Sequence, residues 1–350
     1  MNTLQSIAKQ LVHNGKGILA ADESMSTCGK RFKKYGIPET PEMRRKWREL
    51  LLLAPGIEKG LSGVILFDET IRQETSDGEP FAEYLAGRGI VPGIKVDQKT
   101  EPFDSAQGKP FDSAQDKTPS GSPEEEVTKG LEGLSEHLRE YVGLGAKFTK
   151  WRAVIRIKDN LPTDACIEEN AVRMARYALE SQKAGLVPII EPEVLLDGNH
   201  SFARCEEVVE RVLAVVFARV KEIGASCDGL LLKTSMVLPG KESGEAKSAH
   251  EVAKATVRAL IATVPKEVAG VVFLSGGQTP REATERLNEI VREGKKQNAP
   301  WPLTFSYSRA LQETVMEAWL GKDENVATAQ KVFLKRVEET AAAARGEYNK

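Results

Sequence analysis

The 350-residue chain lacks the cysteine and histidine patterns that identify metal-binding and disulfide-rich proteins. Its four cysteines, Cys28, Cys166, Cys205 and Cys227, form no Cys-x-x-Cys pair, and its four histidines are scattered along the chain. Zinc sites and disulfide frameworks depend on regular spacing of these residues. We therefore expect reduced thiols and no metal site.

An excess of one charge and a long apolar run are lacking as well. Lys and Arg number 49 against 51 Asp and Glu, a net charge of −2, whereas nucleic-acid-binding domains usually carry a basic excess. No run of about 18 apolar residues is present to span a membrane. Residues 1–17 have neither the apolar segment nor the small-residue cleavage site of a signal peptide and resemble a short amphipathic helix. These absences predict a cytoplasmic protein that binds neither nucleic acid nor membrane.

Eight apolar runs of strand length are what the chain does contain. Strands that are apolar on both faces, each followed by a helix, indicate a parallel sheet covered by helices. Eight such units predict an α/β fold of one domain over residues 1–350, a (β/α)8 TIM barrel. The alternative, a doubly wound open sheet, would carry G-x-G-x-x-G after its first strand, where this chain has AADESMSTCGK. The predicted strands are Ile18–Asp22, Gly63–Phe67, Gly93–Val96, Phe148–Ile155, Val187–Val194, Gly229–Lys233, Gly270–Leu274 and Leu303–Tyr307.

Longer segments with helical periodicity separate these runs, and two more follow the last one. Their apolar residues recur at intervals of three and four, which places them on one face of a helix. The predicted helices are Pro41–Ala54, Thr163–Ala184, Ser201–Ile223, Ser248–Thr263, Pro280–Arg292, Ala310–Trp319 and Glu324–Ala344.

Residues 100–126 interrupt this alternation after the third strand. They contain a tandem repeat, PFDSAQGK at Pro102–Lys109 and PFDSAQDK at Pro110–Lys117. Two copies are too few for a repeat architecture, and the Pro, Ser, Gly and Asp content is typical of an exposed loop. We predict an inserted low-complexity loop over 100–126, on the side of the barrel where strands end.

Charged residues stand near the ends of several apolar strands. Lys150 and Arg152 are two residues apart and share a face, and so do Glu191 and Glu193. In a TIM barrel the C-terminal ends of the strands carry the chemistry. We therefore expect one shared polar site there, to which Asp22, Lys95, Lys233 and Arg309 also contribute.

These residue types suggest carbonyl chemistry. Desolvation and neighbouring positive charge disfavour an ammonium, so a lysine in such a site can be neutral. A neutral lysine attacks a carbonyl to give a Schiff base, and the protonated imine stabilises a carbanion equivalent beside it without a metal. Asp22, Glu191 and Glu193 are candidates to move the protons.

A phosphate site is predicted after the seventh and eighth strands. FLSGGQ places Ser275, Gly276 and Gly277 where backbone N–H groups can approach an anion, and Arg309 follows the last strand. An arginine there can bind phosphate through two hydrogen bonds. Lys30 and Arg31, after the first strand, either bind a second phosphate or form a solvated helix face.

The sequence resembles the class I fructose-bisphosphate aldolases over most of its length, from about Gly15 to Gly346. The segments that carry the resemblance are GKGILAADES, GIKVD, FTKWRAV, VPIIEPEVL, LLLK, GVVFLSGGQ and LTFSYSRALQ. It implies reversible cleavage of fructose 1,6-bisphosphate to dihydroxyacetone phosphate and glyceraldehyde 3-phosphate. It also implies sugar phosphates as the small-molecule partners, no cofactor, no metal and a homotetramer. A Schiff-base aldolase for another sugar phosphate and a non-catalytic scaffold on the same barrel are the alternatives.

The resemblance also implies roles for individual residues. Lys233 matches the Schiff-base lysine, and Glu191 matches the acid/base of imine formation, with Glu193 beside it. Asp22 matches the carboxylate near the C4 hydroxyl, and Lys150 matches the lysine that supports the charges around the imine. The substrate- and phosphate-binding residues that it implies are Lys95 and Arg152, then Ser275, Gly276, Gly277, Ser308 and Arg309 at one phosphate, and Ser24, Thr27 and Arg31 at the other.

The chain departs from the family pattern in four places, the first of which is the FDSAQ repeat inserted after the third strand. Ser308 stands where the family commonly has Gly, and Thr234 and Ser235 replace the usual Pro and Asn after the lysine. The tail, 340–350, is short, whereas vertebrate-type members continue for about twenty residues to a terminal tyrosine. Because no charged catalytic group is missing, we expect cleavage to be retained and proton exchange at the enamine to proceed differently or more slowly.

Overall fold

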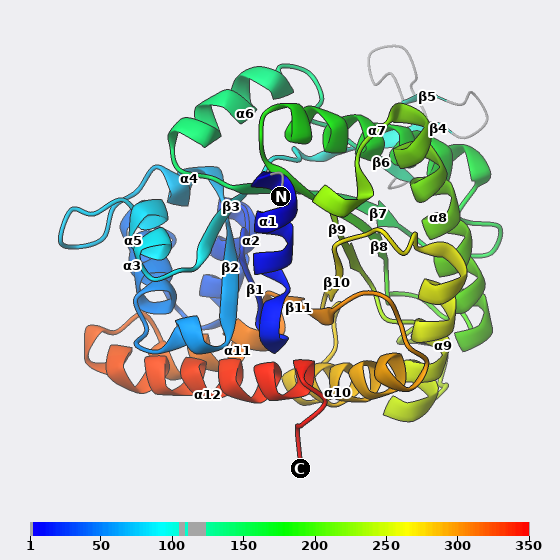
Figure 1. Ribbon diagram of the computed structural model, residues 1–350. Helices are drawn as coiled ribbons and strands as arrows, with labels where there is room; N and C mark the ends of the chain where they lie inside the picture. Colours follow the sequence, from blue (N-terminus) through cyan, green and yellow to red (C-terminus); the bar gives the residue numbers. More distant parts are fainter. Residues whose placement is uncertain (1–2, 105–108, 111–123, 350) are drawn as a thin grey trace, which may run out of the picture.

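Eight parallel strands close into a barrel in this computed structural model, which describes residues 3–104, 109–110 and 124–349 (Figure 1). Each predicted strand is present, with ends that differ by a few residues, and the TIM-barrel fold is confirmed. In their order around the barrel the strands are β1 (Gly17–Ala21), β11 (Leu303–Tyr307), β10 (Gly270–Phe273), β9 (Leu231–Thr234), β8 (Val187–Val194), β7 (Phe148–Ile155), β3 (Val91–Lys95) and β2 (Leu61–Leu66).

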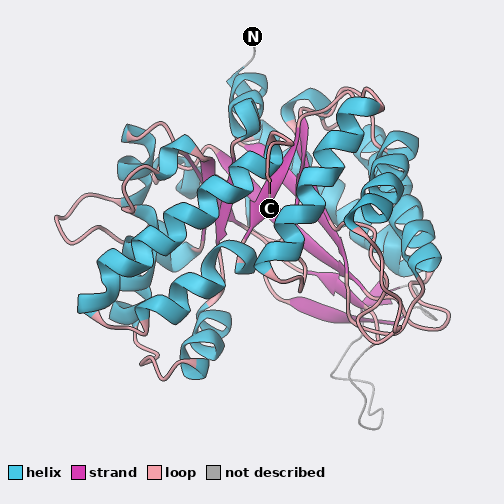
Figure 2. Cartoon of the chain, turned by 90° about the horizontal axis from the view of Figure 1, so that it is seen from below, coloured by secondary structure: helices cyan, strands magenta, loops and turns pink. Residues whose placement is uncertain are grey.

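Helices cover the outside of the barrel (Figure 2). The seven predicted helices are confirmed, although the one expected to end at Arg292 continues to Lys296. The sequence patterns did not indicate α2, because only Cys28 and Phe32 supply a buried apolar stripe in it. The helices are α1 (Thr3–Leu11), α2 (Met25–Lys34), α3 (Pro41–Leu52), α4 (Asp68–Ile71), α5 (Phe81–Gly87), α6 (Leu134–Gly143), α7 (Asp164–Lys183), α8 (Phe202–Ile223), α9 (Ala249–Thr263), α10 (Pro280–Lys296), α11 (Arg309–Trp319) and α12 (Val326–Ala344).

Capping residues fix where the long outer helices begin. Ser248 accepts a hydrogen bond from the Glu251 backbone N–H at the start of α9, and the Glu251 carboxylate accepts one from the Ser248 N–H in return. Thr279 and Glu282 form the same reciprocal pair at α10. Such capping boxes satisfy backbone donors that the first helical turn leaves free, so the helices after β9 and β10 each begin at a defined residue.

The lower half of the barrel interior is an apolar core. Phe148, Ile189, Leu231 and Val272 point inward from their strands and pack together, and Leu11 of α1 packs against the same cluster. Helix α1 therefore closes the N-terminal end of the barrel, where it stands against the strands in Figure 1. The C-terminal end of the same interior remains for polar residues.

A small antiparallel sheet lies beside the barrel where the inserted loop was predicted. It consists of β4 (Thr100–Asp104), β5 (Lys109–Pro110) and β6 (Glu126–Thr128). Phe103 and Val127 are buried in it against Cys166. At the two ends of the predicted loop of 100–126, residues 100–104 and Glu126 are therefore strand residues rather than loop. Most of the repeat, 105–108 and 111–117, lies outside the described residues.

The last helix ends at Ala344, as predicted from the sequence. The first residues of the expected 340–350 tail are therefore helical, as part of α12. Beyond it the Tyr348 backbone N–H donates to Asn288 Oδ1 at 3.0 Å, which holds the tail against α10.

Candidate active site

The polar site lies at the C-terminal ends of the barrel strands, and strand alternation explains how its charges come together. On β8, Ile189 points into the apolar core, and Glu191, two residues later, points into the barrel above it. On β9, Leu231 and Lys233 have the same relation. A cavity of about 800 Å³ opens at this end.

Every site residue predicted from the sequence except Lys30 lines this cavity. They are Asp22, Ser24, Thr27, Arg31, Lys95, Lys150, Arg152, Glu191, Glu193, Lys233, Ser275, Gly276, Gly277, Ser308 and Arg309. The structure thus brings together side chains from seven of the eight barrel strands or the loops that follow them, while their chemical roles stay predictions.

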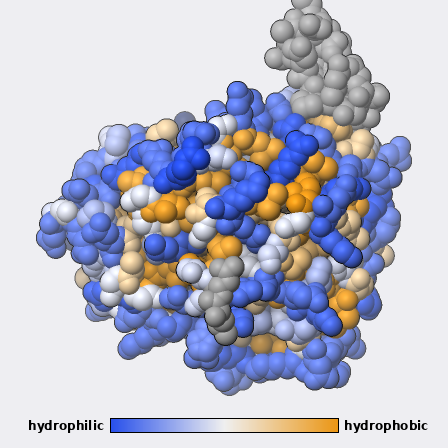
Figure 3. Space-filling view, turned by 45° about the horizontal axis from the view of Figure 1, so that its top comes forward, coloured by the Kyte–Doolittle hydropathy of each residue, from blue (hydrophilic) through white to orange (hydrophobic). Residues whose placement is uncertain are grey.

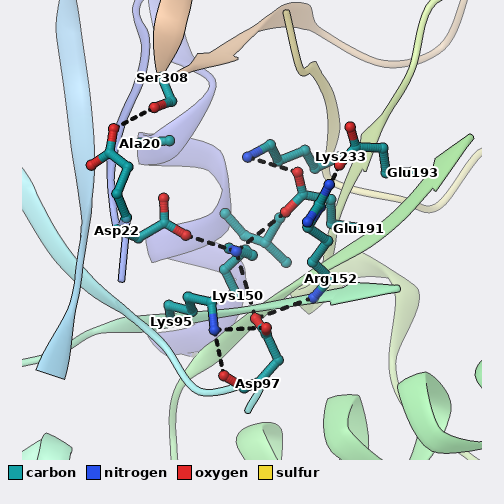
Figure 4. A network of polar contacts seen from close by, with 12 residues as sticks. Ala20, Asp22, Lys95, Asp97, Lys150, Arg152, Glu191, Glu193, Lys233 and Ser308 are labelled. Carbon is teal, nitrogen blue, oxygen red and sulfur yellow. Dashed lines mark hydrogen bonds and ion pairs between the residues drawn. The ribbon is translucent and has the colours of Figure 1, made fainter. Parts of the chain in front are cut away.

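Lys233 and Glu191 form a direct pair at the floor of the cavity. Lys233 Nζ lies 2.9 Å from Glu191 Oε1, and the two residues are 4% and 3% exposed. The amine therefore points into the barrel, toward the carboxylates, and away from bulk water (Figure 4). A carbonyl carbon entering the cavity would meet this nitrogen with a proton acceptor already in contact with it.

Lys150 is the centre of the buried charge network (Figure 4). Its Nζ lies 2.7 Å from Asp22 Oδ2, 3.4 Å from Glu191 Oε2 and 3.5 Å from Asp97 Oδ2. This one ammonium holds carboxylates from the ends of β1, β3 and β8 around a single point. It therefore fixes the distance between the carboxylate beside Lys233 and the carboxylate on the opposite side of the cavity.

A second set of pairs surrounds this centre. Lys95 Nζ lies 2.7 Å from Asp97 Oδ1, and the Arg152 guanidinium contacts the Glu193 carboxylate. The network then comprises four carboxylates and four cations: Asp22, Asp97, Glu191 and Glu193 with Lys95, Lys150, Arg152 and Lys233. Because the charges balance, the site can be buried without a large uncompensated charge.

The pairing sets the protonation of the buried groups. Burial alone would raise the pKa of Asp22, but Lys150 and Lys233 outweigh it and hold that pKa below its ordinary value. Burial would also raise the pKa of Glu191, but the charges of Lys233 and Lys150 outweigh it and lower that pKa. Burial disfavours the charged form of Lys150, but Asp22 and Asp97 raise its pKa. At neutral pH the two carboxylates are ionised and Lys150 is charged.

The loop after β10 has the features of an anion site. Gly276 and Gly277 follow Ser275 with φ values of 38° and 75°, in the left-handed region that glycine adopts most readily. Their N–H groups donate no hydrogen bond within the described part of the chain. Arg309, the first residue of α11, is exposed and lines the cavity across from them. This combination of free N–H groups and a guanidinium can hold a phosphate.

The predicted second phosphate site is arranged differently. Ser24 is the N-cap of α2, and its hydroxyl lies 3.1 Å from the Thr27 hydroxyl. Arg31 pairs with Glu23, which also contacts Arg48 at 2.7 Å. Arg31 therefore faces the cavity while held by a buried carboxylate. Lys30 does not line the main cavity; it borders a smaller one of about 350 Å³ between α2 and α11.

The departures from the family pattern have structural partners. The Ser308 hydroxyl donates to Glu23 Oε1 at 2.6 Å and accepts a hydrogen bond from Arg31 at 3.2 Å. The Ser235 hydroxyl donates to the carbonyl of Val194 at 2.8 Å, which joins the ends of β8 and β9. Both serines thus replace the usual residues while making new hydrogen bonds beside the cavity.

Asp97, Glu23 and Lys241 are among the cavity-lining residues that were not predicted from the sequence. Asp97 shares a strand face with Lys95, so the alternation in GIKVD could have indicated it. Glu23 follows Asp22 directly, and nothing in the sequence indicates that it is buried against Arg48. Lys241 comes from the loop after β9, and only the path of that loop brings it to the cavity.

Within residues 3–104, 109–110 and 124–349, no group of three or more His, Cys, Asp or Glu side chains is placed to hold a metal ion. Among the described helices, none has the length and apolar character to cross a membrane. In Figure 3, hydrophilic residues surround smaller hydrophobic areas on the face shown.

The chain is similar to proteins of one family along its whole length. Residues 3–350 match the family described as fructose-bisphosphate aldolase class-I. A probable fructose-bisphosphate aldolase class 1 of Xanthomonas campestris is 47% identical over 347 residues, which cover 99% of this chain and 98% of that protein. The cytosolic fructose-bisphosphate aldolase 4 of Arabidopsis thaliana is 46% identical over 95% of this chain and 80% of its own.

A solved structure is similar as well. It is a complex of Plasmodium falciparum fructose-bisphosphate aldolase with TRAP and a small-molecule inhibitor. That aldolase is 43% identical in sequence, with a TM-score of 0.92, and the match covers 99% of this chain and 95% of the other.

Proposed function

This chain belongs to the class I fructose-bisphosphate aldolase family, and from that premise we propose that it cleaves fructose 1,6-bisphosphate in the cavity described above, with Lys233 as the nucleophile. The products are dihydroxyacetone phosphate and glyceraldehyde 3-phosphate, and the reaction is reversible. One observation carries the assignment of the nucleophile: Lys233 Nζ is buried within 2.9 Å of the Glu191 carboxylate, inside a charge-balanced cluster.

The first steps join the substrate to the enzyme. The Lys233 ammonium first gives a proton to Glu191, and the freed amine then attacks C2 of the open-chain ketose. As the nitrogen–carbon bond forms, Glu191 returns that proton to the carbonyl oxygen, which becomes a hydroxyl. Glu191, in contact with the amine, accepts a proton from the nitrogen and delivers one to the departing hydroxyl, so that water leaves and an iminium forms. The iminium has the same charge as an ammonium, so the pair with Glu191 persists.

Cleavage follows on the other side of the cavity. Asp22, kept ionised by Lys150, takes the proton of the C4 hydroxyl, the C3–C4 bond breaks and glyceraldehyde 3-phosphate forms. The electron pair of the broken bond moves into the iminium and gives a neutral enamine. Lys150, held among three carboxylates, keeps a positive charge near the reacting carbons while Asp22 becomes protonated.

Release reverses the first steps. The enamine takes a proton at C3 and returns to the iminium, and water then hydrolyses it to dihydroxyacetone phosphate and free Lys233. No step requires a metal ion, because the iminium withdraws the electrons that a Lewis acid would otherwise withdraw. We assign the second phosphate to Ser24, Thr27 and Arg31, with Lys95 and Arg152 as further cations along the substrate.

A cleavage assay separates this proposal from the alternatives. We expect the protein to cleave fructose 1,6-bisphosphate at an unchanged rate in EDTA, and to cleave fructose 1-phosphate less efficiently because one phosphate site is empty. Absence of cleavage would leave only a scaffold function. Equal efficiency on the two sugars would indicate another natural substrate.

The assembly and location remain part of the proposal. Relatives named as cytosolic isozymes support a cytoplasmic enzyme, and the family resemblance supports a homotetramer. Sedimentation equilibrium tests the tetramer, since a mass of one 38.4 kDa chain would contradict it.

A further inference from the structure

Lys241 lies over the glycine turn of the cavity, although neither the sequence patterns nor the mechanism above uses it. Its Nζ is 2.6 Å from the point that a Cβ atom on Gly277 would occupy. The Lys241 backbone N–H donates to the Leu196 carbonyl at 2.9 Å, which ties its loop to the loop after β8. The ammonium thus lies beside the free N–H groups of Gly276 and Gly277, on the wall of the same cavity.

The ammonium has only a weak partner in this position. Asp197 Oδ1 is 3.7 Å away, and the two side chains are 45% and 61% exposed. An exposed pair at this distance contributes little to stability, so it does not lock the lysine in place. Lys241 can thus turn toward an anion without breaking a buried ion pair, unlike Lys150.

The position of the turn identifies which part of the substrate would meet Lys241. Lys233 on β9 pairs in register with Val272 on β10, and Ser275–Gly277 begin two residues after the end of β10 at Phe273. The phosphate on C1 is attached to the carbon next to C2, the carbon that Lys233 attacks. This phosphate must therefore lie close to Lys233, at the end of one of the two strands beside β9. On the β8 side it would meet the negative Glu193, whereas on the β10 side it would meet the glycine turn and Lys241.

We propose that Lys241 binds the C1-phosphate of the ketose and that Asp197 moderates this binding. The inference rests on the proposed function, because it assumes a ketose phosphate bound at Lys233. Lys241 would then supply a charge that is absent from the pattern of residues carried over from the family. Its contribution falls on the dihydroxyacetone phosphate half of the substrate alone.

Three variants test this assignment at fixed ionic strength. Lys241→Met removes the charge while keeping much of the stem, Asp197→Asn removes the competing carboxylate, and Lys254→Met removes an exposed lysine of α9 outside the cavity as the control. For each variant we would measure kcat and KM for fructose 1,6-bisphosphate, and inhibition by dihydroxyacetone phosphate and by glyceraldehyde 3-phosphate separately.

We expect the Lys241→Met substitution to affect binding of the C1-phosphate half of the substrate and not the other half. Lys241→Met should raise KM and weaken inhibition by dihydroxyacetone phosphate about tenfold, which corresponds to about 1.4 kcal/mol. Inhibition of Lys241→Met by glyceraldehyde 3-phosphate should stay unchanged. Asp197→Asn should lower KM and strengthen inhibition by dihydroxyacetone phosphate. Lys241→Arg should bind dihydroxyacetone phosphate as the parent protein does, and Lys254→Met should change neither KM nor inhibition.

Two results would overturn the inference. Unchanged inhibition by dihydroxyacetone phosphate in Lys241→Met would show that the lysine does not touch the phosphate. Equal weakening of both inhibitors would indicate a general distortion of the loop. If the unaltered protein cleaves nothing, the proposed function fails, and calorimetric binding of dihydroxyacetone phosphate to the same variants still decides the role of Lys241.

Discussion

The two ends of the barrel interior use the same strands for opposite purposes. At the N-terminal end Phe148, Ile189 and Leu231 pack against one another and α1. Two residues further along the same strands, Lys150, Glu191 and Lys233 form the charge network. One alternating pattern thus supplies both the apolar core and the reactive groups. Only the position of a residue along its strand determines to which of the two it belongs.

The two ends also respond differently to substitution. Truncating an apolar side chain leaves a cavity whose cost is a loss of stability. Removing one member of a buried ion pair leaves the other member uncompensated, and here that member is a group that moves protons. We therefore expect losses of stability from the lower layer and losses of rate from the upper layer.

Among substitutions that leave Lys233 in place, the largest effect should come from Lys150→Met. Removing this ammonium leaves Asp22, Asp97 and Glu191 close together with less positive charge. This raises the pKa of Asp22 and of Glu191 and removes the charge beside the reacting carbons. We expect kcat to fall about 10³-fold. Lys147→Met, an exposed lysine just before the start of β7, is the control, and equal losses in the two variants would contradict the comparison.

Glu191→Gln should have the next largest effect. The amide keeps the shape of the side chain but cannot take the proton from Lys233, so kcat should fall about 10²-fold. Borohydride should still trap the substrate on the enzyme, but more slowly. Trapping and turnover at the original rates would exclude Glu191 as the proton acceptor.

Leu231→Ala tests the lower layer on the same strand as Lys233. Leu231 is fully buried, and we expect the free energy of unfolding to fall by about 2–5 kcal/mol. The kcat of the folded fraction should stay close to that of the parent enzyme. Denaturant titration with activity measured in parallel checks both, and a large loss of kcat without a loss of stability would remove the distinction between the two ends.

The smallest effect concerns pH. Because the pKa of Asp22 is lowered in the folded state, its contribution to stability is present above the pKa of the unfolded chain and is lost as the pH falls. Between about pH 5 and about pH 4 this loss should remain below about 1 kcal/mol. Asp22→Asn should therefore show a flatter dependence over that range. An equal slope in the variant would show that Asp22 is not preferentially ionised in the fold.

The sequence predicts the barrel and the charged end because both follow from strand alternation. Glu191 and Glu193 are two residues apart on an apolar strand, so their shared direction needs no tertiary information. The small sheet at Phe103 was missed because a short apolar pair beside a polar repeat gives too weak a signal.

Contacts between distant loops could not be predicted in the same way. Glu23 meets Arg48 and Ser308 only because α3 and the end of β11 converge on it. Lys241 reaches Gly277 only because its loop is anchored to Leu196. Such contacts depend on loop paths, which local residue patterns do not encode.

Mass spectrometry after borohydride reduction with fructose 1,6-bisphosphate would locate the lysine that forms the Schiff base. If Lys233 forms the Schiff base, the reduced three-carbon or six-carbon phosphate adduct will be found on the peptide containing Lys233, and Lys233→Met will carry none. An adduct on Lys150 or on another lysine, or full cleavage activity in Lys233→Met, would contradict the account.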